Sequence, residues 1–255
     1  MIRRSGAVTP DETGWRVGGQ SWWLWVFASE EATVYSIQPG RGFEQAALIL
    51  GADFAGFLTH DGWRVYLKFL LAFHQTCLAH LLRRCREMSE IANPAAARFP
   101  QAVQRILQQA LGLRDRRQAA QISEPGLAVA RGRLEAHLDR LLVPHYRSAA
   151  NQRFAAHLYR NREFLFTFLT CPGLEATNWR AEQALRPAVV NRKVWGGNRT
   201  WRGAHTQEIL NSVRQTCRQQ KRSWLPSLIA MLCSPLRKVW NLFASDLSPP
   251  IPQLC

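Results

Sequence analysis

Acidic residues are scarce in this sequence: Asp and Glu number 18, against 33 Lys and Arg, in 255 residues. The formal net charge is therefore +15 at pH 7. A chain this basic is expected to meet a polyanion, because neutralising phosphates releases their condensed counterions. Arginine carries most of the positive charge, which favours a bidentate grip on phosphate. Nucleic acid is the partner we favour; an anionic membrane surface or a merely solvated surface are the alternatives.

Long apolar runs and closely spaced cysteines are missing as well. The most apolar window, residues 65–82, contains Lys68, His74 and His80, so it makes a poor membrane span. No apolar segment follows Met1–Arg4, and we therefore expect no secretory signal. The six cysteines lie far apart, without the spacing of a small disulfide-bonded domain. These absences predict a cytoplasmic chain with reduced thiols, associated with the nucleoid if its partner is DNA.

The first 80 residues carry the signals of α/β structure. Short aromatic and β-branched runs at 21–28 and 32–38 predict a hairpin. We expect a helix over 42–50, closed by Gly51, and then a strand over 54–59. Further along, the pattern predicts a helix over 63–71 and a strand over 73–77.

Helical periodicity dominates the rest of the chain. Residues 79–168 read as three or four helices, divided at Asn93-Pro94 and at Ser123–Gly126. A helix is expected over 179–185, ended or kinked by Pro187. A Gly- and Arg-rich loop is predicted over 191–203, an amphipathic helix over 204–218 and a loose Pro-rich tail over 245–255. The expected fold class is α/β, a mixed sheet with a helical insertion.

Because acids are few, their positions are informative. Asp11 precedes the predicted hairpin, and Asp61 ends a predicted strand, where an α/β sheet forms its binding crevice. Each acid also has a purely structural interpretation: Asp11 as a turn residue, Asp61 as a helix N-cap, and Glu182 as an exposed helical acid paired with Arg. Glu12 cannot easily share the role of Asp11, because adjacent strand residues point to opposite faces.

Several motifs occur in the order of one known family, and together they cover residues 8–222. The motifs are Asp11-Glu12-Thr13-Gly14-Trp15, Asp61-Gly62-Trp63 followed by Tyr66, Cys77-Leu78-Ala79-His80, Asn178 through Pro187, Asn191-Arg192-Lys193 and Thr216-Cys217. The chain thus resembles the DDE-type transposases of the bacterial insertion sequence sixty-six family. The resemblance implies an RNase H-like fold with a catalytic and metal-binding triad of Asp11, Asp61 and Glu182.

The resemblance also implies the chemistry. Three clustered carboxylates suit two Mg²⁺ (or Mn²⁺) ions, which activate the attacking oxygen and stabilise the leaving oxygen. Water would first free a transposon 3′-OH, which would then attack the target strand. The expected partners are double-stranded DNA, as transposon ends and target, and a second copy of the chain in a homodimer. The implied organisation is an RNase H-like core over 1–78 and 171–222, a helical insertion over 79–170, and a C-terminal helix and tail over 223–255.

Other residues gain roles from the resemblance. His80 is expected to border the active site and to contact DNA or orient a carboxylate; a buried hydrogen-bonded pair with Cys77 and a weak zinc site with Cys85 are the alternatives. Basic side chains interleaved with Trp195 and Trp201 suit phosphate contacts with stacking on splayed bases. These DNA-binding candidates are Arg186, Arg192, Lys193, Arg199 and Arg202. The cluster of Trp22, Trp23 and Trp25 is expected to pack in the core.

The sequence departs from the family pattern in three places. Pro10 precedes Asp11 in an expected central strand and removes one ladder N–H. Trp179 stands where some relatives carry a second Asn. Only ten residues precede Asp11, whereas the family has a long N-terminal region, so we expect a catalytic fragment or a truncated product. A non-catalytic DNA-binding remnant and a metal-dependent nuclease of the same fold are the rival interpretations.

Overall fold

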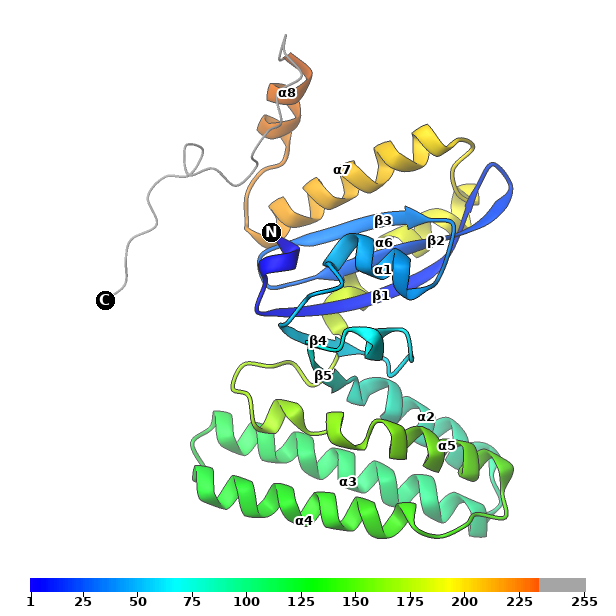
Figure 1. Cartoon of the computed structure of the whole chain (residues 1–255), viewed down its shortest axis with the longest axis vertical. Helices are drawn as coiled ribbons and strands as arrows, with labels where there is room; N and C mark the ends of the chain where they lie inside the picture. The colour runs from blue at the N-terminus through cyan, green and yellow to red at the C-terminus, as the bar shows by residue number, and fades with distance from the viewer. Residues whose placement is uncertain (234–255) are drawn as a thin grey trace.

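A mixed five-stranded sheet forms the centre of the chain, in a computed structural model that describes residues 1–233 (Figure 1). The strand order is β3-β2-β1-β4-β5. β2 runs antiparallel to both of its neighbours, β1 and β3, whereas β4 and β5 run parallel to β1. The strands are β1 (Ala7–Val17), β2 (Gln20–Ala28), β3 (Thr33–Gln38), β4 (Phe57–His60) and β5 (Phe73–Thr76). The predicted hairpin is confirmed as β2 and β3.

Helices cover both faces of the antiparallel half of the sheet. Trp25 and Phe27 point toward α1 (Phe43–Leu50), while Leu24 and Val26 pack against α6 (Trp179–Trp195). α7 (Trp201–Gln219) lies along β3 on the α6 side (Figure 1). A strand buried on both faces needs apolar residues at successive positions. This requirement explains why β2 reads as a continuous aromatic and aliphatic run.

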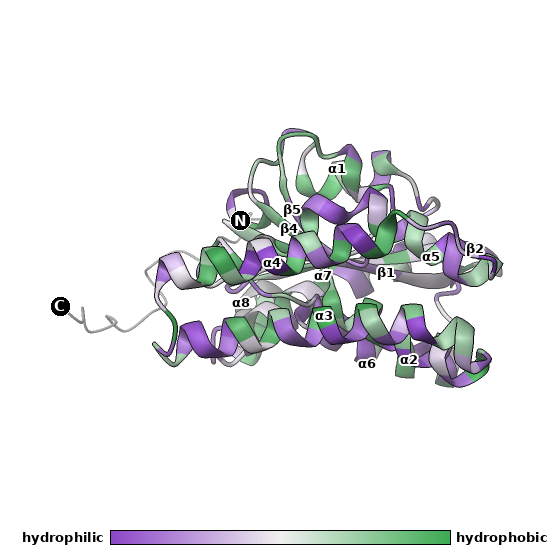
Figure 2. Ribbon diagram, turned by 90° about the horizontal axis from the view of Figure 1, so that it is seen from below, coloured by the Kyte–Doolittle hydropathy of each residue, from purple (hydrophilic) through white to green (hydrophobic). Residues whose placement is uncertain are grey.

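Four helices between β5 and α6 pack around a core of their own, beside the parallel end of the sheet (Figure 1). They confirm the predicted helical stretch: α2 (Leu78–Ile91), α3 (Pro94–Gln118), α4 (Glu124–Leu142) and α5 (Ala149–Arg160). The breaks were also predicted, since Asn93 caps α3 and Ser123 caps α4. Hydrophobic and hydrophilic residues alternate along each ribbon (Figure 2), as amphipathic helices require.

The predicted helix over 63–71 is wrong. This stretch contains only a single 3-10 turn, η2 (Tyr66–Lys68), between β4 and β5. The two strands are parallel neighbours, so the twelve intervening residues must return the chain from the end of β4 to the level at which β4 began. Burial of Tyr66 and Phe69 in the core beneath α1 holds that short connection in place.

The prediction for residues 179–203 is also wrong in part. α6 continues through Pro187 to Trp195, so residues 191–195 are helical and the loop is limited to 196–200. A proline inside a helix removes one hydrogen bond. Ala184, Leu185 and Ala188 on either side of it are buried against the sheet, and this packing keeps the helix continuous. The helix ends at Gly196, whose φ of 80° is left-handed.

The last described helix is α8 (Leu225–Cys233), and the predicted tail over 245–255 lies outside the described residues. Among residues 1–233, no helix has both the length and the apolar character needed to cross a membrane. The cysteines of this part of the chain are all free thiols.

Candidate active site

Asp11 lies on the central strand at the point where the sheet divides. β1 pairs with β4 only at Ala7 and Val8, although its ladder with β2 continues to Val17. Pro10, which has no N–H to donate, comes just after the last β1–β4 pair. Beyond Val8 the two parallel strands therefore separate, and Asp11 stands beside the opening. The alternative interpretation of Asp11 as a turn residue is wrong, since the residue is in the middle of β1, the strand that the family resemblance implied.

Asp61 comes directly after the last residue of β4, on the other side of this opening. Its Oδ1 accepts a hydrogen bond of 2.8 Å from the backbone N–H of Trp63. The carboxylate thus caps a turn, and the alternative of a helix N-cap is wrong because no α-helix begins here. Crevices at the carboxyl ends of parallel strands are the usual binding sites of α/β sheets.

Glu182 reaches the same region from the first turn of α6. Its Oε1 lies 3.4 Å from Nε2 of His80, and 35% of its side chain is exposed. His80 in turn has Nδ1 at 3.3 Å from Sγ of Cys77, which also accepts the backbone N–H of Asn178 at 3.4 Å. The partner of Glu182 is therefore a histidine of α2, and the alternative interpretation as an exposed acid paired with Arg is wrong.

Asp61 and Glu182 both act electrostatically on Asp11. Burial raises the pKa of Asp11 from 3.8 to about 7, with a further increase from the adjacent Glu12 and smaller ones from Asp61 and Glu182. A hydrogen bond from the Glu12 N–H opposes this increase. Segments separated by 50 and 121 positions thus bring their acids into one region. A cation bound there would offset the burial and the charge repulsion that together keep the Asp11 pKa high.

The acidic, histidine and cysteine side chains of this region do not form a complete set of metal ligands. Within residues 1–233, no three His, Cys, Asp or Glu side chains are grouped so that they could hold a metal ion. This includes Cys77, His80 and Cys85, the trio considered for zinc. The carboxylate donors are of the kind that Mg²⁺ and Mn²⁺ prefer. Asp11, Asp61 and Glu182 therefore fit such ions by donor chemistry, although their carboxyl groups are not gathered into one ligand set in this arrangement.

Glu12 has a different role from its neighbour and was not identified as a functional residue from the sequence. Its side chain is 3% exposed; the Tyr66 hydroxyl donates to its Oε2, and Arg41 donates two hydrogen bonds to Oε1. The Arg41 guanidinium lies over the rings of Trp23 and Trp63. Glu12 thus joins β1 to the β4–β5 connection across the opening of the sheet. The sequence signal for this link was the presence of Tyr66, five positions after Asp61, among the motifs shared with the family.

The predicted DNA-binding side chains extend away from Glu182 along α6 and into α7. Four of them, Arg186, Lys193, Arg199 and Arg202, are exposed. Arg192 is partly buried because its guanidinium donates to Thr13 Oγ1 and to the carbonyl of Gly14 on β1. Arg192 therefore helps to attach α6 to the free edge of β1.

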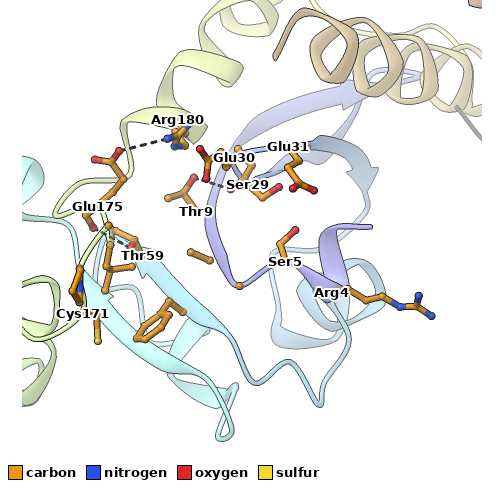
Figure 3. Close-up of a pocket in the computed structure, with 17 residues that line it drawn as sticks. Arg4, Ser5, Thr9, Ser29, Glu30, Glu31, Thr59, Cys171, Glu175 and Arg180 are labelled. Atoms are coloured by element: carbon orange, nitrogen blue, oxygen red, sulfur yellow. Dashed lines mark hydrogen bonds and ion pairs between the residues drawn. The ribbon is translucent and has the colours of Figure 1, made fainter. Parts of the chain in front are cut away.

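A cavity of ≈ 460 Å³ lies near the segments that carry the three acids, although Asp11, Asp61 and Glu182 do not line it (Figure 3). Thr9, Thr59 and Arg180 line it, and each precedes one of the acids by two positions. Thr59 Oγ1 donates to the carbonyl of Glu175, and Arg180 lies 3.6 Å from the Glu175 carboxylate. Three acids also line it, namely Glu30, Glu31 and Glu175. This acidic lining does not suit a phosphate.

Comparison with known proteins gives one match. The family model described as "Transposase IS66 family" matches residues 1–206, which is most of the chain and includes Asp11, Asp61 and Glu182. No curated protein and no solved structure matches the chain.

Proposed function

Because the chain belongs to the IS66 family of transposases, we propose that it cleaves and joins DNA strands with Asp11, Asp61 and Glu182 as its catalytic acids. One observation carries the proposal: Asp61 and Glu182, from distant segments, lie near enough to Asp11 at the place where β1 and β4 separate to add to the increase in its pKa that burial causes. The proposal includes an RNase H-like architecture, supported by the mixed sheet with β1 at its centre.

Asp11, Asp61 and Glu182 would hold two Mg²⁺ or Mn²⁺ ions. When bound, these ions supply activation of the attacking oxygen and stabilisation of the leaving oxygen. Asp11 must lose its proton to act as a ligand, which its raised pKa makes difficult until a cation is present. His80 keeps Glu182 on the side of α6 that faces α2, and Cys77 holds the other nitrogen of the imidazole.

The exposed cations would hold the DNA backbone. Arg186 and Lys193 lie on α6, whose first turn carries Glu182. Arg199 lies on the loop after α6, and Arg202 lies in α7. A duplex bound along these residues would present a phosphodiester to the acids. Hydrolysis would free a 3′-OH, which would then displace the 3′-oxygen of a target phosphodiester. Two copies of the chain would hold the two transposon ends.

The decisive experiment compares wild type with Asp61→Asn on element-end DNA, with Mg²⁺ or Mn²⁺. We expect nicked or joined products from the wild type and none from the variant. Asp53→Asn, which changes an exposed aspartate on the segment before β4, is the matched control and should retain activity. Equal products from wild type and Asp61→Asn would refute the proposal, and DNA binding without any cleavage would identify a non-catalytic remnant.

A further inference from the structure

An exposed aromatic stack lies at the tip of the β1–β2 hairpin, beyond the three acids. Trp22 of β2 and Trp201 of α7 stack with ring centroids 5.2 Å apart and an interplanar angle of 27°. The His205 ring lies one helical turn further on, 6.0 Å from Trp201. Trp201 is 48% exposed although it is a large aromatic residue. We name these three residues the tryptophan platform.

Three elements fix the platform in position. Trp22 is opposite Trp15 in the β1–β2 ladder, and the Trp15 indole N–H donates to Oδ1 of Asn198 at 2.7 Å. The backbone of Asn198 accepts from Gly18 and donates to the carbonyl of Arg16. The loop before α7 is thus fastened to the hairpin. An aromatic surface held in this way loses little conformational freedom when it binds a ligand.

The surroundings of the platform are basic. Between Glu182 and Glu208 the chain carries five Arg and Lys and no acid, and Glu208 itself is paired with His205 of the platform at 2.7 Å. A cavity of ≈ 460 Å³ beside it is lined by Trp22, Trp23, Arg16 and Arg192, among other residues, and no acid contributes to that lining. Aromatic rings flanked by cations bind a planar base together with its phosphates. An apolar peptide or a second apolar surface would not require the positive charge.

The sheet places the platform at a defined distance from the acids. Trp15 lies four positions after Asp11 on β1, which corresponds to about 13 Å along the strand. One strand of a DNA duplex has one phosphate per about 3.4 Å of helix axis, so this distance corresponds to roughly four nucleotides. Taking DNA as the ligand rests on the function proposed above. We propose that the tryptophan platform binds an unpaired DNA base about four nucleotides from the phosphate positioned at Asp11.

Fluorescence of 2-aminopurine tests this directly and without divalent metal. The full chain is titrated into two oligonucleotide duplexes that carry the probe four nucleotides from the cleavage position, one fully paired and one with the probe unpaired. We expect tighter binding and quenching of the unpaired probe. Trp201→Ala should weaken binding of the unpaired duplex roughly 5- to 150-fold, as the loss of one stacked base predicts. Trp201→Phe should retain most of the affinity.

The controls separate this proposal from the catalytic one. Trp224→Ala, which alters an exposed tryptophan next to α8, should leave both affinities unchanged. Equal affinity of the wild type for both duplexes, or an unquenched probe, overturns the platform even if no variant folds. A change in oligomeric state on Trp201→Ala, with DNA affinity unchanged, would also overturn it and assign the surface to protein contact. Failure of strand cleavage with base preference intact would refute the catalytic proposal alone.

Discussion

At the scale of single residues, Asp11 and Glu12 show how one strand assigns neighbouring acids to different tasks. Adjacent strand residues point to opposite faces. Asp11 therefore shares the α6 face with its partner Val26, whereas Glu12 is bonded to Tyr66 and Arg41 on the α1 face. Both carboxylate oxygens of Glu12 accept hydrogen bonds from these partners, whereas within residues 1–233 Asp11 accepts one from the Glu12 N–H. Asp11 is therefore the acid that gains most from a bound cation.

The raised pKa of Asp11 predicts a pH dependence of stability. The folded-state pKa of about 7 exceeds the unfolded value of 3.8, so the stabilisation is present below pH 3.8 and is lost as pH rises through about 7. In metal-free buffer, the free energy of unfolding of wild type should fall relative to Asp11→Asn between about pH 4 and 7. The slope is at most about 1.4 kcal/mol per pH unit. Urea unfolding of both proteins across this range measures it, and a constant difference would contradict the prediction.

Removal of the Tyr66 hydroxyl should destabilise the protein. Tyr66→Phe leaves a buried Glu12 carboxylate with Arg41 as its remaining side-chain partner, which should cost about 1–3 kcal/mol of unfolding free energy. Tyr159→Phe, at a side chain in α5 that is 69% exposed, is the matched control and should have little effect. Indistinguishable urea midpoints for the two variants would show that the Glu12–Tyr66 bond contributes no net stability.

At the scale of elements, the loop between α6 and α7 contains two adjacent glycines, each of which is required for a different reason. Gly196 has a φ of 80° and open space where a Cβ would be, so only its conformation requires glycine. Gly197 has a φ of 131°, and a Cβ there would lie 2.4 Å from the carbonyl oxygen of Arg16 on β1. The chain approaches β1 closely at this point because Asn198 bonds to the strand.

Gly197→Ala should therefore destabilise the chain more than Gly196→Ala. Gly196→Ala should cost about 1 kcal/mol for its left-handed backbone. Gly197→Ala combines unfavourable backbone with a clash against main chain, and we expect about 2–4 kcal/mol from the two effects together. Chemical denaturation of both variants provides the comparison. Equal losses would mean that the loop moves away from β1 at little cost.

At the scale of the whole molecule, the excess of positive charge should govern DNA affinity. The logarithm of the binding constant should fall linearly and steeply with the logarithm of salt concentration, because each neutralised phosphate releases counterions. Replacing Arg199 and Arg202 together with Gln should reduce the slope by about 0.9 for each phosphate that the variant no longer neutralises. Fluorescence anisotropy at several salt concentrations measures both slopes. A flat dependence would exclude a basic DNA-binding surface.

The sequence by itself determined the chemical composition of the site and the local elements around it. Ordered motifs suggested the three acids through a family resemblance, and aromatic runs and capping residues predicted the β2–β3 hairpin and the breaks before α3 and α4. These features depend on residues near one another in the chain, and their physical causes act locally.

Only the tertiary structure decided how those segments meet. It shortened the expected helix over 63–71 to one 3-10 turn, because β4 and β5 are parallel neighbours. It extended α6 through Pro187, because burial of Ala184, Leu185 and Ala188 against the sheet outweighs one missing hydrogen bond. It also brought Tyr66 to Glu12 and Trp201 to Trp22, across 54 and 179 positions. Such pairings depend on packing between distant segments, which local sequence patterns do not encode.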